Sequence, residues 1–390
     1  MVNALFPPDR TGSSVFTSQL SDALSARGHD VHVVTSSRAL DDATSSAPYE
    51  ITRLRARRVS VGKLAWNYSI PLNFTPRNYR RVRAVLTEFR PDVIVCHGQI
   101  FDLTWMLCVL ARRMGIPVVV VVHTAVWNEN TLRRAVLRTF ERLVIRPLIR
   151  RARPSFVAVD KWTRDDARRS LASGSPLQVI PVSVDGSQMV GGDGAAARAK
   201  YSLPDGPILL SLGHVVALRN RHALVRALPR ILSVHPDLRV VIVGDVRDES
   251  FLEIARDFRV DDAIVCLGSV PHADIKDLLA ASEIEMHDLQ GLGLGITSIE
   301  AMCAGVPIVA WATDDNYPGL SLRSFDGLML LDGAGPAELS AATLELLSDP
   351  VRREAAVAGQ RALVERVFDP MAVAAAYETV LEGVVGRSCP

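Results

Sequence analysis

Residues 288–310 have the composition of an anion-binding segment. They read DLQGLGLGITSIEAMCAGVPIVA, which predicts a glycine-rich turn, a short helix and then a buried strand. Gly291, Gly293 and Gly295 let the backbone turn and approach a ligand closely, because glycine has no Cβ atom. The helix is predicted to begin near Thr297 or Ser298 and to direct its unpaired N–H groups at that ligand. A phosphate group would fit such a site.

The same segment has a structural alternative, since glycine-rich turns between a strand and a helix also occur without ligands. Glu300 would then be a solvated helix carboxylate. As a whole, however, the segment resembles the donor site of the family 4 glycosyltransferases of GT-B fold. In that family, Glu-Gly-Phe-Gly-Leu is followed after three residues by a second Glu and then by Ala-Met-Ala-x-Gly-x-Pro-Val-Val-Ala. The resemblance implies that Glu300 holds the ribose hydroxyls of a nucleotide sugar. It assigns further donor contacts to Gly293, Leu294, Gly295 and Ile296.

One position departs from the family pattern. Leu292 stands eight residues before Glu300, where the family has its first Glu, whose carboxylate contacts hydroxyls of the transferred sugar. A hydrogen bond to a charged group contributes about 1.5–3 kcal/mol, so its absence is expected to cost about one to two decades in affinity or rate. We therefore expect another residue to hold the sugar, or the sugar to lack that hydroxyl group.

Two further segments resemble the phosphate-binding regions of the family. PPDRTGSS follows the first predicted strand and resembles the N-terminal glycine loop, which implies donor contacts by Gly12 and Ser13. LSLGHVVALRNR at 210–221 resembles Gly-Arg-Leu-x-x-x-Lys-Gly, with His214 at the Arg position and Arg219 at the Lys position. A guanidinium stays charged and grips phosphate bidentately, whereas His214 supplies charge only if phosphates raise its pKa. Either side chain could instead cap a strand end.

Two histidines stand at predicted strand ends in the first half. His123 ends VVVVVH and precedes Thr124, which resembles the Thr-x-His or Val-x-His segment of the family. The resemblance implies that its imidazole lies beside the transferred sugar and that it is catalytic together with Arg219 and Glu300. His97, in VIVCHG, is expected to line the acceptor side. A histidine at a strand end is also often purely structural.

The remaining signals concern the base and the leaving group. VCLGSV at 265–270 resembles the strand beside the nucleobase, so the backbone of Val270 is expected to contact the base. The sequence has no Asp-x-Asp motif and no cluster of His, Cys and Asp with metal-ligand spacing. We therefore expect chemistry without a metal or other cofactor, in which Arg219, N–H groups and a helix dipole stabilise the diphosphate. The resemblance implies that the anomeric configuration is retained.

Length and composition limit the class of protein. A chain of 390 residues fits two domains, and its 48% hydrophobic content is sufficient for two buried sheets. The five cysteines form an odd set without a C-x-x-C pair, and four of them lie in apolar runs, which predicts buried free thiols in a reducing cytosol. Neither a signal peptide nor an apolar segment long enough to span a bilayer is expected.

The charge is distributed unevenly although the net charge is only +1. Residues 51–153 hold 20 Lys and Arg against 5 Asp and Glu. These cations alternate with bulky apolar residues that include Leu64, Trp66, Tyr68 and Phe140, a pattern that suits an anionic membrane surface. The alternative is that the arginines solvate helix faces. Nucleic acid is not expected as a partner, because no RNP, KH or helix-turn-helix pattern occurs.

The elements that must position these residues alternate in type along the chain. Strands are predicted at 3–6, 30–35, 93–96, 118–122, 156–159, 208–212, 240–243, 263–267, 284–286, 307–310 and 328–331. Helices are predicted at 15–27, 77–89, 104–114, 221–233, 249–258, 273–281, 298–304, 337–348 and 370–383. This alternation predicts βαβ units and parallel sheets. The Gly-, Ala- and Asp-rich residues 184–205 are predicted to form a linker.

The sequence therefore predicts an α/β protein of GT-B fold, with two doubly wound Rossmann-like domains facing across an interdomain cleft. An acceptor-side domain is expected at 1–185, completed by a C-terminal helix at 370–390, and a nucleotide-sugar-binding domain at 186–369. The expected function is a retaining, metal-independent transfer of a sugar from a nucleoside diphosphate to a lipid-linked or small-molecule acceptor. The protein is expected in the cytoplasm, peripherally on the inner face of the membrane. The alternatives are a nucleotide-sugar epimerase or phosphorylase and a catalytically silent sugar-nucleotide-binding subunit.

Overall fold

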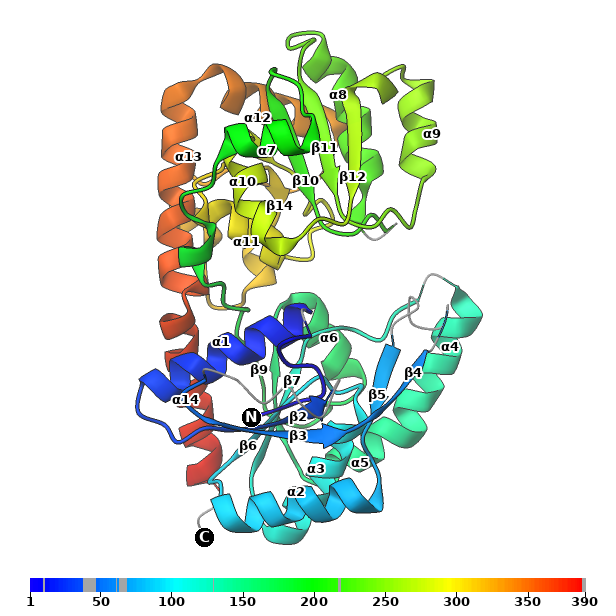
Figure 1. Ribbon diagram of the computed structural model, residues 1–390, viewed down its shortest axis with the longest axis vertical. Helices are drawn as coiled ribbons and strands as arrows, with labels where there is room; N and C mark the ends of the chain where they lie inside the picture. The colour runs from blue at the N-terminus through cyan, green and yellow to red at the C-terminus, as the bar shows by residue number, and fades with distance from the viewer. Residues whose placement is uncertain are drawn as a thin grey trace. The chain divides into compact units, whose positions relative to one another are not determined.

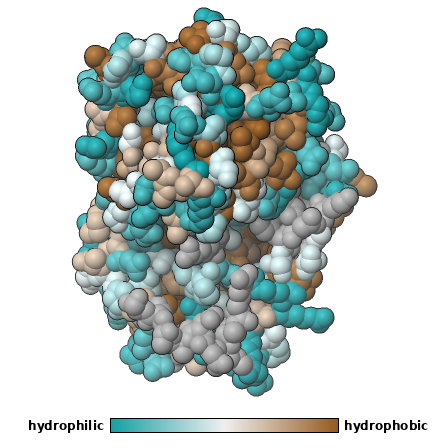
Figure 2. Space-filling view, turned by 45° about the horizontal axis from the view of Figure 1, so that its top comes forward, coloured by the Kyte–Doolittle hydropathy of each residue, from teal (hydrophilic) through white to brown (hydrophobic). Residues whose placement is uncertain are grey.

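The chain forms two compact units, Met1–Ser183 with Pro370–Pro390 and Val184–Asp369 (Figure 1). The computed structural model describes residues 1–9, 11–37, 47–60, 62, 69–128, 130–216 and 219–387. Leu64, Trp66, Tyr68 and Cys389 lie outside the described residues. Hydrophilic and hydrophobic side chains are mixed over the face of the molecule that Figure 2 shows. No helix within the described ranges is both long and apolar enough to cross a membrane.

The first unit is built on a seven-stranded parallel sheet with the strand order β3-β2-β1-β6-β7-β8-β9. The strands are β1 (Val2–Asn3), β2 (His32–Ser37), β3 (Glu50–Arg55), β6 (Ile94–His97), β7 (Val118–Val122), β8 (Ser155–Ala158) and β9 (Leu177–Val179). β7 consists of five buried valines, whose side chains alternate between the two faces of the sheet. Val118, Val120 and Val122 belong to one core, and Val119 and Val121 belong to the other.

Helices cover both faces of this sheet. The helices of this unit are α1 (Gly12–Ala26), α2 (Pro76–Phe89), α3 (Asp102–Met114), α4 (Thr131–Phe140), α5 (Arg146–Arg150), α6 (Lys161–Arg169) and the C-terminal α14 (Pro370–Gly386). α14 packs against α1, with Tyr377 in the core that contains Leu20. Arg27 and Glu378 join the same two helices at the surface, with Nη2 and Oε2 2.6 Å apart. The C-terminal helix thus belongs to the first unit.

The second unit contains a four-stranded parallel sheet with the order β12-β11-β10-β13 and a parallel pair β14-β15. These strands are β10 (Ile208–Leu212), β11 (Arg239–Val243), β12 (Ile264–Gly268), β13 (Ile284–Glu285), β14 (Ala310–Trp311) and β15 (Leu330–Leu331). Its helices are α7 (Gly194–Tyr201), α8 (Arg221–Leu232), α9 (Ser250–Asp257), α10 (Ile275–Ala280), α11 (Ile296–Cys303), α12 (Pro336–Ser348) and α13 (Pro350–Leu363). The parallel topology follows from the alternation of strands and helices.

Three local features differ from the sequence-based expectations. The basic segment after residue 50 forms the edge strand β3 and then β4 (Arg57–Ser60), which pairs antiparallel with β5 (Ser69–Leu72). Residues 184–205 include α7, which packs on α10, since the Asp193 side chain caps an alanine-rich turn. Cys96 and Cys108 are buried as predicted, but Cys266 is exposed because β12 is an edge strand.

Candidate functional site

The glycine-rich turn lies between β13 and α11, at the carboxyl end of the sheet in the second unit. Gly291 and Gly293 adopt φ values of +65° and +104°, which only glycine adopts without strain. A Cβ atom at Gly291 would lie 2.8 Å from the Trp311 ring. The N–H of Leu294 donates to the Tyr317 hydroxyl at 2.8 Å, so the turn is fixed by an aromatic side chain as well. α11 begins at Ile296, one or two residues before the predicted start at Thr297 or Ser298.

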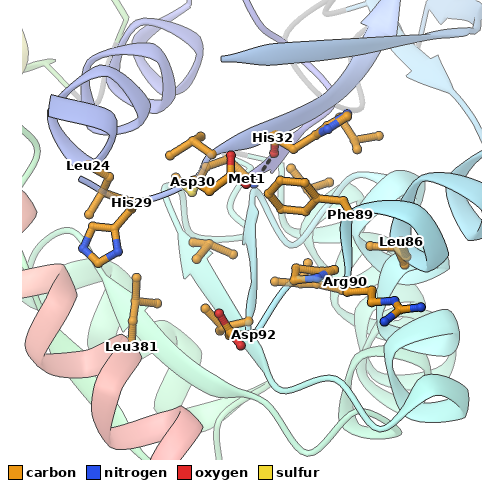
Figure 3. Close-up of a pocket in the computed structure, with 17 residues that line it drawn as sticks. Met1, Leu24, His29, Asp30, His32, Leu86, Phe89, Arg90, Asp92 and Leu381 are labelled. Carbon is orange, nitrogen blue, oxygen red and sulfur yellow. Dashed lines mark hydrogen bonds between the residues drawn. The ribbon is translucent and has the colours of Figure 1, made fainter. Parts of the chain in front are cut away.

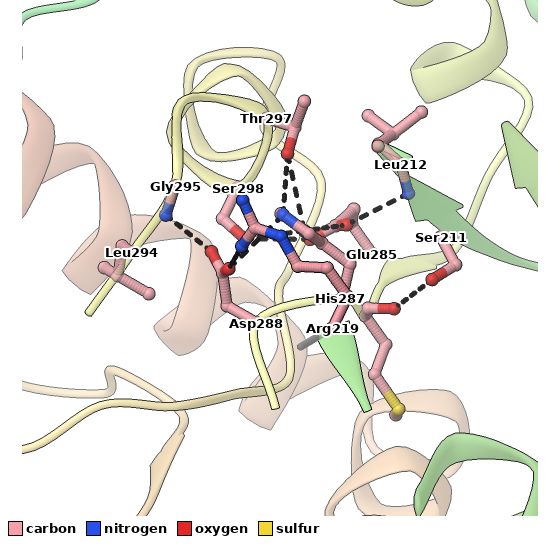
Figure 4. Close-up of polar contacts among 12 residues, drawn as sticks. Ser211, Leu212, Arg219, Glu285, His287, Asp288, Leu294, Gly295, Thr297 and Ser298 are labelled. Atoms are coloured by element: carbon pink, nitrogen blue, oxygen red, sulfur yellow. Dashed lines mark hydrogen bonds and ion pairs between the residues drawn. The ribbon is translucent and has the colours of Figure 1, made fainter. Parts of the chain in front are cut away.

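Arg219 and the start of α11 converge on Asp288 (Figure 4). Nη1 of Arg219 lies 2.6 Å from Oδ1 of Asp288, and the N–H of Gly295 donates to Oδ2 at 2.5 Å. Burial of Asp288 would raise its pKa, but His287 and Arg219 outweigh this effect and hold the pKa below its ordinary value. An ionised carboxylate therefore lies between the two groups that the sequence predicts to bind phosphate.

A buried polar network lies behind this carboxylate. The His287 ring places Nδ1 2.8 Å from Oε1 of Glu285 and Nε2 3.3 Å from Oδ1 of Asp288. The hydroxyl of Thr297 lies 2.8 Å from the same Nε2 atom, and that of Ser298 donates to Oε2 of Glu285 at 3.2 Å. The network connects β13 with the first turn of α11 and orients Asp288.

Arg221 lies beneath the loop that carries Arg219. Its guanidinium is 2% exposed and donates to the carbonyl oxygens of Leu212 at 3.1 Å and His287 at 3.3 Å. Burial lowers the pKa of Arg221 to about 10, so the group still carries its charge at neutral pH. This buried cation joins the ends of β10 and β13. No sequence motif indicated this role.

Glu300 lies on α11 and is 6% exposed. Its Oε1 atom lies 2.8 Å from Nε2 of His272, which belongs to the loop after β12. His272 was not among the predicted site residues, because it is distant in sequence and belongs to no recognised motif. Val270, the predicted base contact, belongs to the same loop and is partly exposed. The structure thus brings the predicted base and ribose residues to one edge of the second unit.

His214 follows β10 and is about half exposed, with 48% of its side chain accessible. Its Nδ1 atom accepts a hydrogen bond from the N–H of Asp245 at 3.2 Å. Burial, followed by the nearby charge of Arg247, lowers the pKa of His214. The imidazole is therefore neutral at neutral pH in the protein alone, and Arg219 is the stronger candidate for the diphosphate charge.

His97 and His123 form a pair at the carboxyl ends of β6 and β7 in the first unit. Nδ1 of His97 lies 3.0 Å from Nε2 of His123, and the ring of Phe16 meets both imidazoles edge-on. Burial lowers the pKa of His123 to about 4 and that of His97 well below its ordinary value. Nε2 of His97 has no hydrogen-bond partner among the described residues. Both imidazoles are therefore neutral, and one hydrogen bond joins them.

Gly12 and Ser13 form the first turn of α1, next to the histidine pair through Phe16 on the same helix. Thr11 caps this helix by accepting a 3.3 Å hydrogen bond from the N–H of Ser14. The carbonyl of Ser13 accepts a hydrogen bond from the Asn3 side chain at 3.1 Å. The predicted glycine loop is therefore the capped N-terminus of a helix of 15 residues.

A separate cavity of about 220 Å³ lies at the opposite end of the first sheet (Figure 3). It is bordered by His32 at the start of β2, Phe89 and Arg90 at the end of α2, and Leu381 of α14. None of the predicted site residues lines it. Ligands of parallel sheets bind at the carboxyl ends of the strands, so this cavity is not the candidate site.

The fold of the two units matches that of solved structures. The crystal structure of HepE from Anabaena in complex with UDP and glucose matches with a TM-score of 0.68 over 98% of both chains, at 16% sequence identity. The chain is an α/β protein of GT-B fold with two Rossmann-like domains, as predicted.

The family follows from sequence. Residues 11–183 match the Glycosyl transferase 4-like domain, and residues 195–362 match Glycosyl transferases group 1. With these two domains, the chain belongs to the family 4 glycosyltransferases and is a glycosyltransferase. The D-inositol 3-phosphate glycosyltransferase of Acidothermus cellulolyticus is 26% identical over 97% of this chain and 85% of the relative. A GDP-mannose-dependent monoacylated alpha-(1-6)-phosphatidylinositol monomannoside mannosyltransferase of Corynebacterium glutamicum is 30% identical over 53% of this chain and 56% of the relative.

Proposed function

We propose that the protein transfers a sugar, with retention of configuration and without a metal, from a nucleoside diphosphate to a lipid-linked or small-molecule acceptor. The observation that carries the donor site is the convergence of Arg219 and the N–H of Gly295 on one carboxylate. Guanidinium and helix N-terminal N–H groups that hold a carboxylate are also suited to the oxygens of a phosphate. The UDP and glucose in the crystal structure of HepE support the same class of donor.

Each donor group has its own residues in this proposal. The carboxylate of Glu300 accepts hydrogen bonds from the ribose hydroxyls, and the backbone at Val270 contacts the base. Arg219, His214 and the turn from Gly293 to Ile296 face the diphosphate. Arg219 and the N–H groups stabilise the negative charge that develops on the leaving phosphate, because they are fixed before the reaction begins. A resident metal is not required for this charge stabilisation.

The first unit supplies the acceptor side. His123 is the proposed contact to the transferred sugar, and its neutral ring can donate or accept a hydrogen bond there. Gly12 and Ser13 are proposed to face the diphosphate and acceptor from the start of α1. The relatives named for inositol phosphate and for phosphatidylinositol mannosides support a polyol-phosphate or lipid-linked acceptor.

We further propose that the first unit binds the inner face of an anionic membrane peripherally, from the cytoplasm. α4 has no buried residue. An exposed apolar stripe follows α4 and the π-helical turn Glu141–Ile145 after it, and consists of Leu132 (74% exposed), Val136 (51%), Phe140 (45%) and Leu143 (68%). Exposed arginines at 142 and 150 accompany this stripe. Apolar residues flanked by arginine suit an anionic lipid surface.

Calorimetric titration with UDP, GDP, ADP and dTDP tests the donor site. We expect one nucleotide to bind, and Glu300→Ala to weaken that binding by about 1.5–3 kcal/mol. Sugars on the identified base are then supplied with and without candidate acceptors. Conversion of the nucleotide sugar without acceptor would indicate an epimerase instead. Binding without release of diphosphate under any acceptor would indicate a silent subunit, which Leu292 makes a specific alternative.

A further inference from the structure

The carboxylate of Asp288 makes the contacts that the proposed function assigns to a donor phosphate. Its two oxygens engage Nη1 of Arg219 at 2.6 Å and the N–H of Gly295 at 2.5 Å (Figure 4). Arg219 is the cation assigned to the diphosphate, and Gly295 is the N-cap residue of α11. One side chain of the protein therefore satisfies both groups at once.

This carboxylate is fixed in place and ionised. Asp288 is 4% exposed, and the buried His287 ring supports it from behind at 3.3 Å. The Arg219 side chain is 37% exposed, so a ligand can reach the guanidinium while Asp288 lies beneath it. A phosphate that binds Arg219 and the start of α11 must therefore replace Asp288 at these groups or bind close to its negative charge.

We propose that Asp288 is an internal competitor of the donor diphosphate that weakens binding of the product nucleoside diphosphate. The proposal rests on the proposed function, because it assumes that Arg219 and the turn at Gly295 bind the diphosphate. A free terminal phosphate carries more negative charge than a phosphate esterified to a sugar. Repulsion by Asp288 is therefore stronger against the product than against the donor, which favours product release.

A positioning role for Asp288 would change nucleotide affinity in the opposite direction. If Asp288 only positioned Arg219 for the phosphate, removal of its charge would loosen Arg219 and weaken nucleotide binding. If Asp288 competes, removal of its charge leaves Arg219 uncompensated and strengthens binding. The nucleoside part of the ligand is assigned to Glu300 and Val270. A change at Asp288 should therefore alter the affinity for the nucleoside diphosphate but not that for the nucleoside.

The experiment is a titration of the wild type and Asp288→Asn with the matching nucleoside diphosphate and its nucleoside. Asparagine has the shape of aspartate and can still accept the Gly295 hydrogen bond through its amide oxygen. We expect the diphosphate to bind about tenfold more tightly to the variant, and the nucleoside to bind with unchanged affinity. Asp332→Asn is the matched control, because it removes an exposed carboxylate paired with Arg323 in the same unit. It should change neither affinity.

Each outcome decides between defined alternatives. Weaker or unchanged diphosphate binding by folded Asp288→Asn would overturn the competitor role, while wild-type binding would still support the donor site. Absence of nucleotide binding by both proteins would overturn the donor site itself. Asp288→Ala serves as a second variant should the asparagine protein not fold, and the same tightening is expected. In an Arg219→Ala background the gain from Asp288→Asn should shrink, because the released cation is then missing.

Discussion

Nε2 of His272 lies 2.8 Å from Oε1 of Glu300 and joins the loop after β12 to α11. The two side chains differ in accessibility, since 44% of His272 and only 7% of Glu300 is exposed. The histidine therefore covers a carboxylate that water scarcely reaches. In the proposed function, this carboxylate is the ribose contact, so His272 determines how it is presented.

His272→Ala should lower the free energy of unfolding by about 1–2 kcal/mol, because it leaves a buried carboxylate without its partner. His272→Gln keeps an N–H donor at a similar distance and should recover most of this loss. Thermal unfolding of both variants measures the difference. An equal loss in the two variants would show that packing of the ring, rather than its hydrogen bond to Glu300, matters.

The histidine pair of the first unit predicts a pH dependence of stability. The pKa of His123 is about 4 in the folded protein, against an ordinary value of 6.5, because burial disfavours the charged ring. The unfolded chain thus binds a proton that the folded chain does not. The stabilisation is fully present above about pH 6.5 and is lost as the pH falls towards about 4.

Stability should therefore decrease by about 2 kcal/mol between pH 7 and pH 5 from His123 alone. His123→Gln should flatten this part of the profile, and His97→Gln should also do so, because the pKa of His97 is lowered too. Denaturant unfolding at each pH provides the measurement. A variant profile parallel to the wild type between pH 7 and pH 5 would contradict the assignment.

Much of the fold could be predicted because its signals are local. Runs such as the valines of β7 and the helical periodicity between strands are properties of neighbouring residues. The neighbourhood of His97 and His123 also follows from two strand ends, once β6 and β7 pair in parallel with His97 beside Val121. The basic strand β3 could not be recognised from the sequence, because apolar and polar residues do not alternate regularly along EITRLR.

The donor site shows where the sequence is insufficient. Family resemblance indicates Glu300 and Arg219, but it gives no role to Asp288, which lies in the same segment as Glu300. Its role depends on Arg219, which is 69 residues away in the chain. A carboxylate is an ordinary loop residue in sequence. Only the folded arrangement shows that it occupies groups expected to bind phosphate.

Gly244 should be irreplaceable for the end of β11. Its φ is +133°, and a Cβ atom there would lie 2.5 Å from the carbonyl carbon of Gly213. Gly244→Ala should therefore cost about 3 kcal/mol or more, from strain and from displacement of the segment that leads to His214. Gly268→Ala is the matched control, because its φ is +67° but nothing lies within 4 Å of the added atom. It should cost only about 1 kcal/mol, and equal losses in thermal unfolding would argue against the close approach.

The apolar stripe on α4 predicts a defined pattern of membrane binding. Cosedimentation with phosphatidylcholine vesicles that contain phosphatidylglycerol should decrease at least about tenfold for Leu132→Glu with Leu143→Glu, since each leucine loses its insertion energy. Arg142→Glu with Arg150→Glu should reduce binding mainly at low salt, because screening already weakens charge attraction at high salt. Arg58 is a poor choice for this test, as its guanidinium binds Asp9 at 2.6 Å.

Val234→Glu is the control for the stripe, because Val234 is 58% exposed but belongs to the second unit. Its vesicle binding should equal that of the wild type. Binding of the wild type to vesicles of phosphatidylcholine alone should be much weaker, since the arginines then meet no anionic lipid. If the leucine and arginine variants sediment with anionic vesicles as the wild type does, α4 does not contact the membrane, and its exposed face requires another explanation.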